Sequence, residues 1–171
     1  VPAPPCEPGE RTESDLRGQT TAAERSNPPQ AFNCNLELVG KFEGSGSRMD
    51  FSTFDNCGYV PTPGLAGQKY RGVVVVDASD RHSPRAAMSL ETAATIEPNE
   101  TLKTHVGRKL LSALDSGPKA PATFEVYDVA NCQHPILKGS VSILGFWGHA
   151  GRFSPDGRTF YGTASRGGAT D

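Results

Sequence analysis

The chain has 171 residues, of which 36% are hydrophobic and 21% charged, and its formal net charge is −2. Its longest apolar runs, at residues 72–76 and 141–147, fall far short of the roughly 20 apolar residues that a membrane-spanning helix needs. The 17 basic and 19 acidic residues form no basic stripe, which argues against nucleic-acid binding. With 19 glycines and 14 prolines, the composition predicts an all-β protein of short strands joined by turns.

The first 35 residues are predicted to form an irregular arm outside the folded core. Six prolines lie among mixed charges in residues 1–33, and such a segment buries too little apolar surface to offset the entropy lost on ordering. A short helix over residues 15–25 is the alternative for part of it. Regular structure is expected from Leu36 onward, because apolar and polar residues alternate up to Phe42 with the two-residue period of a strand.

Four cysteines, Cys6, Cys34, Cys57 and Cys132, show neither zinc-site spacing nor a redox Cys-x-x-Cys. An even number of scattered cysteines in a loop-rich chain favours disulfides over unpaired thiols. Disulfides in turn indicate an extracytoplasmic location, secreted or at the cell surface. Three pairings are possible, and a Cys34–Cys57 bond is the preferred one because its loop is short.

An internal repeat dominates the rest of the chain. Residues 73–80, Val-Val-Val-Val-Asp-Ala-Ser-Asp, match residues 124–131, Phe-Glu-Val-Tyr-Asp-Val-Ala-Asn, without a gap. The match aligns Asp77 with Asp128 at a shift of 51 residues. A repeat of this period predicts successive copies of one supersecondary unit.

The repeat extends in both directions from this match. Upstream, the same shift aligns Tyr59 with Leu110. Downstream, a third copy begins, because residues 107–111 recur as residues 157–161 at a shift of 50. The chain therefore holds two complete units and part of a third.

Each unit is expected to contain a hairpin followed by two further strands. The hairpin turns around a glycine, which in the third copy is part of Asp156-Gly157. The third strand is the most apolar and ends in Asp77 or Asp128, whose carboxylate is expected to accept backbone N–H bonds in an Asx-type turn. Their recurrence at one repeat position favours this structural role over paired acids or calcium ligands.

Pro84 and Pro135 are expected to open the last strand of their units. Four antiparallel strands in about 50 residues is the spacing of a β-propeller blade. The predicted organisation is an arm over 1–35, blades over about 36–90 and 91–143, a partial blade over 144–164, and a polar tail over 165–171.

The segments 73–84 and 124–135, each an apolar run closed by Asp and followed by Pro, resemble the LVIVD-repeat family of bacterial secreted and surface β-propellers. The resemblance covers roughly residues 36–164. It implies that each apolar run ends a central blade strand and that the proline leads to the outer strand. The chain departs from the family in its longer glycine-rich loop, residues 61–72, in Cys132 within a blade turn, and in its low number of blades.

The number of blades implies that the ring is incomplete. Propellers close with roughly 4 to 8 blades, and this chain supplies at most about three. The terminal blades would leave apolar faces or strand edges exposed. We therefore expect the remaining blades of a longer propeller, further copies of the chain, or a partner protein to cover them.

Histidines and aromatic residues are the remaining site candidates. His105 and His149 lie near the first strands of their blades, where side chains approach a propeller axis, and could hold a divalent metal or copper; satisfied or solvated histidines are the alternative. Phe146 and Trp147, flanked by glycines, could form a binding anchor, and packing between blades is the alternative.

The sequence does not decide whether the protein is an enzyme, and it favours a protein without enzymatic activity. It contains no nucleophile elbow, phosphate-binding glycine loop or His-Glu-x-x-His motif, so no catalytic residue is assigned. The leading hypothesis is a secreted or surface-exposed propeller segment that acts as a binding scaffold. The alternatives are a metal-dependent redox or hydrolytic enzyme completed by missing blades, and a purely structural fragment.

Overall fold

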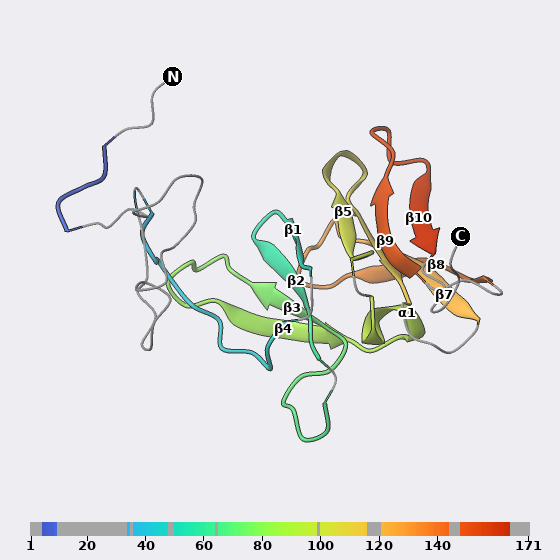
Figure 1. Ribbon diagram of the computed structural model, residues 1–171, viewed down its shortest axis with the longest axis horizontal. Coiled ribbons are helices and arrows are strands. Elements are labelled where there is room, and N and C mark those ends of the chain that lie inside the picture. The colour runs from blue at the N-terminus through green and yellow to red at the C-terminus, as the bar shows by residue number, and fades with distance from the viewer. Residues whose placement is uncertain are drawn as a thin grey trace, which may run out of the picture. The chain divides into compact units, whose positions relative to one another are not determined.

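A computed structural model describes residues 5–9, 34, 36–47, 50–63, 65–98, 100–115, 121–143 and 148–164. The chain forms two compact units, Val1–Val39 and Gly40–Asp171. Every helix and strand of the described residues belongs to the second unit (Figure 1). The predicted polar tail, residues 165–171, lies outside the described residues.

The second unit is built from antiparallel sheets, which confirms the predicted all-β class. Two sheets have four strands each, and their strands follow one another in chain order. The first sheet contains β1 (Ser52–Phe54), β2 (Cys57–Pro61), β3 (Val73–Asp77) and β4 (Arg85–Leu90). The second contains β5 (Lys103–His105), β6 (Leu110–Leu114), β7 (Ala122–Asp128) and β8 (Ile136–Ile143). A two-stranded sheet of β9 (Gly148–Phe153) and β10 (Phe160–Ala164) follows, and the short helix α1 (Ala93–Ile96) links the first two sheets.

The structure corrects the alignment inside the repeat. Asp77 and Asp128 end β3 and β7 at the predicted shift, but Cys57 pairs with Asp77 whereas Leu110 pairs with Asp128. Leu110 is therefore the counterpart of Cys57, and the predicted match with Tyr59 was wrong. The cause is the first turn of each sheet, which has two residues between β1 and β2 and four between β5 and β6.

The predicted strand over residues 36–42 does not form. No other strand pairs with this segment within the described part of the chain, and an alternating pattern without a neighbouring ladder cannot make a sheet. Close backbone packing explains why position 40 is a glycine, because a Cβ at this position would lie 1.9 Å from the carbonyl oxygen of Arg81. Leu36 and Leu38 are 74% and 83% exposed, so the two-residue period here marks neither a strand nor a buried face.

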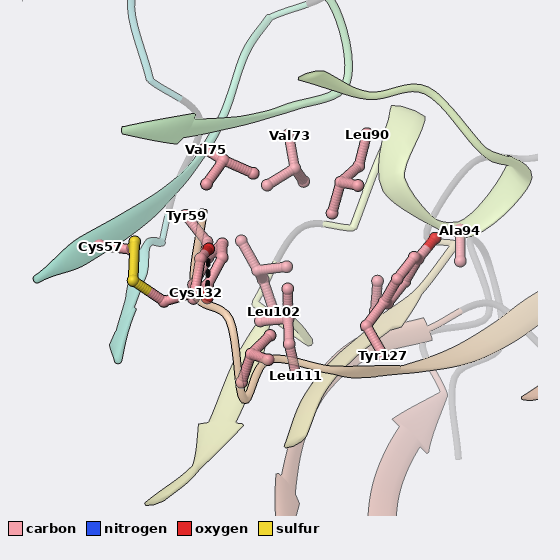
Figure 2. Close-up of a cluster of buried hydrophobic side chains, with 12 residues drawn as sticks. Cys57, Tyr59, Val73, Val75, Leu90, Ala94, Leu102, Leu111, Tyr127 and Cys132 are labelled. Carbon is pink, nitrogen blue, oxygen red and sulfur yellow. Dashed lines mark hydrogen bonds between the residues drawn. A yellow bond between two sulfur atoms is a disulfide. The ribbon is translucent and has the colours of Figure 1, made fainter. Parts of the chain in front are cut away.

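A hydrophobic core joins the first sheet to the second (Figure 2). The faces of the two sheets meet, and the Tyr59 hydroxyl crosses between them to donate a hydrogen bond of 3.0 Å to the backbone oxygen of Cys132. The members contributed by the first sheet and α1 are Cys57, Tyr59, Val73, Val75, Leu90 and Ala94. The members from the second half are Leu102, Leu111, Ala113, Tyr127, Val129 and Cys132.

The four cysteines form two disulfides, but the preferred pairing of Cys34 with Cys57 was wrong. Cys6 bonds to Cys34, and Cys57 bonds to Cys132 across 75 residues of sequence. Loop length is not what decides the second bond. The packing of the two sheets brings the start of β2 beside the turn after β7, where the Cα atoms of Cys57 and Cys132 lie 5.8 Å apart, within the range that a disulfide requires.

Replacing both Cys57 and Cys132 by serine is expected to lower the free energy of unfolding by about 4 kcal/mol, because the bond closes a long loop in the unfolded chain. Urea titration followed by circular dichroism measures the change. A serine pair at Cys6 and Cys34 controls for the general effect of removing a disulfide. An unchanged midpoint for the Cys57/Cys132 variant would contradict the assignment.

Candidate functional site

The first strands of the three sheets lie side by side (Figure 1). Between β1 and β5, the backbone N–H of Thr104 donates to the Ser52 hydroxyl at 3.0 Å, and the Thr104 hydroxyl donates to the carbonyl of Thr53 at 2.9 Å. Between β5 and β9, Glu100 forms a parallel bridge with Ala150. The residues at the beginnings of β1 and β5 are consequently gathered beside the middle of β9.

A polar pocket of about 460 Å³ opens at this point. Lys103 and Asp50 form an ion pair in it, and each side chain is 26% exposed. Glu100 lies with its carboxylate 4.0 Å from Nδ1 of His149, and Arg152 has no ion-pair partner among the residues that the structure describes. The remaining lining residues are Ala150, Gly151, Tyr161 and Thr163.

A second hollow, an apolar groove of about 520 Å³, lies on the face of the first sheet opposite to the core. Phe42, Gly44 and Gly46 line it on the side of the segment that precedes β1. Five residues of the first sheet and its margins line the rest of the apolar wall: Phe51, Gly58, Val60, Val76 and Ala78.

These five groove residues have counterparts at the same repeat positions of the second sheet. The strand registers equate Gly58 with Leu111 and Val76 with Tyr127, because each pair of positions adjoins the terminal Asp in the same way. The complete set of counterparts, in the same order as above, is Leu102, Leu111, Ala113, Tyr127 and Val129. All of these are buried in the core where the second sheet packs on the first. The groove is thus lined by the repeat positions through which the second sheet packs on the first.

The structure does not bring His105 and His149 together. Nδ1 of His105 accepts a hydrogen bond from the backbone N–H of Arg108, and its Nε2 lies 3.0 Å from the carbonyl oxygen of Pro155, so both ring nitrogens are engaged. His149 lies beside Glu100 at the other end of β9. Five residues of extended chain separate the two ends, which is roughly 15–20 Å. The described residues contain no group of three side chains suited to hold a metal ion.

The three aspartates expected in turns all accept local hydrogen bonds. Oδ1 of Asp77 accepts from the N–H and hydroxyl of Ser79, and Oδ1 of Asp128 accepts from the N–H of Ala130 at 2.8 Å. Oδ1 of Asp156 accepts from the Ser154 hydroxyl at 2.6 Å, and the following glycine, Gly157, adopts a left-handed φ of 65°. Pro84 and Pro135 directly precede β4 and β8. These residues shape turns and lie away from the polar pocket.

A buried polar cluster ties α1 to the second sheet. The hydroxyls of Thr92 and Tyr127 both donate to the carboxylate of Glu125, the latter at 2.6 Å, and Glu125 is only 4% exposed. Burial is the main cause that raises the pKa of Tyr127 above its usual value, and the bond to Glu125 adds to it. The cluster lines neither hollow, so we assign it to the packing of the two sheets.

Sequence reasoning missed the polar pocket. Asp50, Glu100, Lys103 and Arg152 occupy unlike positions of the repeat, so the alignment gives no sign that they meet. The usable signal was the start of the first strands of the first two sheets, since the beginnings of β1 and β5 lie together beside β9. The proposed anchor residues Phe146 and Trp147 lie outside the described residues.

Comparison with known proteins adds no family to this description. No protein-family model matches the chain, and no curated protein matches it.

Asp77 predicts an acid-sensitive contribution to stability. Hydrogen bonds from Ser79, first from its side chain and then from its backbone, lower the pKa of the Asp77 carboxyl. A lowered folded-state pKa stabilises the fold at pH values above the ordinary aspartate pKa of about 3.9, and the contribution is lost as the pH falls through the folded value.

Asp77→Asn is therefore expected to flatten the fall of unfolding free energy between about pH 5 and pH 2, as followed by urea titration at a series of pH values. Asp80→Asn in the same turn controls for the loss of a carboxylate. A slope identical to that of the unsubstituted protein would show that Asp77 is not the responsible group.

Proposed function

We propose that the chain is a segment of a secreted or surface-exposed β-propeller of LVIVD-repeat type that acts as a binding scaffold. The carrying observation is the side-by-side arrangement of β1, β5 and β9 in three successive sheets, the relation that first strands have around a propeller axis. The recurrence of the Asx turn at Asp77 and Asp128 supports the same interpretation.

The groove on the first sheet is the place where a further sheet of the same repeat type would dock. Its wall carries the counterparts of the residues through which the second sheet packs on the first. Gly58 occupies the repeat position at which the second sheet has Leu111, and the lack of a side chain at Gly58 helps to make the surface hollow. In this proposal the occupant is the apolar face of another sheet, from remaining blades, a second copy or a partner protein.

The two disulfides support an extracytoplasmic location. Both disulfides join cysteines far apart in sequence, and such bonds persist in oxidising compartments. In the described ranges, no helix is long and apolar enough to cross a membrane.

A metal-dependent enzyme is the weaker alternative. His105 uses both ring nitrogens in hydrogen bonds, and His149 lies at the far end of β9. The mixed charges of the polar pocket suit recognition of a ligand, and we assign no catalytic residue.

The scaffold proposal predicts association through the groove. In purified protein a second copy is the available source of an apolar sheet face, so we expect self-association at rising concentration in sedimentation velocity. Val60→Lys places an ammonium group in the groove and is expected to weaken association by about tenfold or more, because burial of a valine side chain is worth roughly 1.5–3 kcal/mol.

Val106→Lys is the matched control, because Val106 is 68% exposed in a turn that does not line the groove. Circular dichroism checks that both variants fold. If the protein stays monomeric at every concentration, or if both lysine variants associate equally well, the groove is not the docking surface.

A further inference from the structure

We propose that the polar pocket between β9 and the beginnings of β1 and β5 binds a small peptide-like zwitterion, a molecule with one free ammonium and one free carboxylate group. Its volume of about 460 Å³ lies within the range of small-molecule sites. Its lining combines acidic and basic side chains with a tyrosine. The inference is independent of the groove, which lies on another surface of the protein.

Arg152 supplies the site for the carboxylate. It is exposed on β9, and no acidic partner lies within ion-pair distance of it in the described part of the chain. A guanidinium presents two parallel N–H donors that match the two oxygens of a carboxylate. Tyr161 pairs with Arg152 across β9 and β10 and lines the same pocket, so its hydroxyl is an additional donor.

Glu100 supplies the site for the ammonium group. Its backbone is fixed against β9, since its N–H donates to the carbonyl of His149 at 3.3 Å. The only basic group within 4.0 Å of its carboxylate among the described residues is His149, which carries a charge only when protonated. The carboxylate is about one-third exposed and can therefore accept a ligand ammonium at little cost of desolvation.

The balance of charge selects a zwitterion over a simple ion. Asp50 and Lys103 neutralise each other, which leaves one acidic and one basic side chain, Glu100 and Arg152, for a ligand. A plain anion would meet the Glu100 carboxylate, and a plain cation would meet the Arg152 guanidinium. Only a ligand that carries both charges satisfies both side chains.

The spacing of the two backbone positions indicates the size of the ligand. Glu100 bridges Ala150, and Arg152 lies two residues farther along β9, which places the two backbones roughly 7–10 Å apart. An extended peptide advances about 3.3–3.6 Å per residue, so a peptide of two or three residues spans this separation between its termini.

Isothermal titration calorimetry with triglycine tests the proposal. We expect triglycine to bind, and N-acetyltriglycine and triglycinamide, which each lack one charge, to bind roughly tenfold more weakly because each loses one charge-assisted contact. Arg152→Gln and Glu100→Gln are each expected to raise the Kd for triglycine by about the same factor. Arg158→Gln alters an exposed arginine of the β9–β10 turn outside the pocket and should leave the Kd unchanged.

Several outcomes would overturn the proposal. Absence of triglycine binding at millimolar concentration excludes the site. Equal binding of the acetylated peptide shows a plain anion site, and equal binding of the amide shows a plain cation site. An unchanged Kd in either glutamine variant, with thermal melting showing a folded protein, places the ligand elsewhere; the groove proposal would stand in each of these cases.

Discussion

Face-to-face packing of the first sheet on the second determines where the polar pocket and the apolar groove lie. Twelve buried residues fill the contact. At its end the Tyr59 hydroxyl donates to the backbone oxygen of Cys132, and the Cys57–Cys132 disulfide joins positions 75 residues apart in sequence. Because the sheets stack in this way, their first strands become neighbours, and residues from the beginnings of β1 and β5 line one pocket together with residues 150–152 of β9. The opposite face of the first sheet is left as a groove lined by the counterparts of buried core residues.

One repeated interface thus gives the protein two different surfaces. In the second sheet, Leu111 and Tyr127 bury against the first sheet, whereas their counterparts Gly58 and Val76 line the groove. In the polar pocket, by contrast, residues from unlike repeat positions meet, and the result is a charged site with Glu100 and Arg152. The groove suits a further apolar sheet face, and the pocket suits a small charged ligand. We propose that the protein is a scaffold that holds both.

The sequence predicts the parts of this structure that depend on local chemistry. The apolar runs before Asp77 and Asp128 form β3 and β7, and both aspartates make the expected turns, because a short carboxylate bonds to nearby N–H groups whatever surrounds it. It fails where three-dimensional packing decides. The partner of Cys57 follows from the contact between sheets, and a longer turn before Leu110 shifts the repeat by two residues in a way that a gap-free alignment hides. The charged pocket is missed for the same reason, since its residues come together only when the first strands are neighbours.

The most direct measurement of the central claim is the disulfide map of the natural protein. Proteolysis without reduction, followed by mass spectrometry, identifies which cysteine-containing peptides remain joined. The stacked arrangement of the two sheets predicts one joined pair that contains Cys57 and Cys132 and another that contains Cys6 and Cys34. A joined pair that contains Cys34 and Cys57 would contradict the arrangement, because no disulfide would then hold the turn at Cys132 against β2.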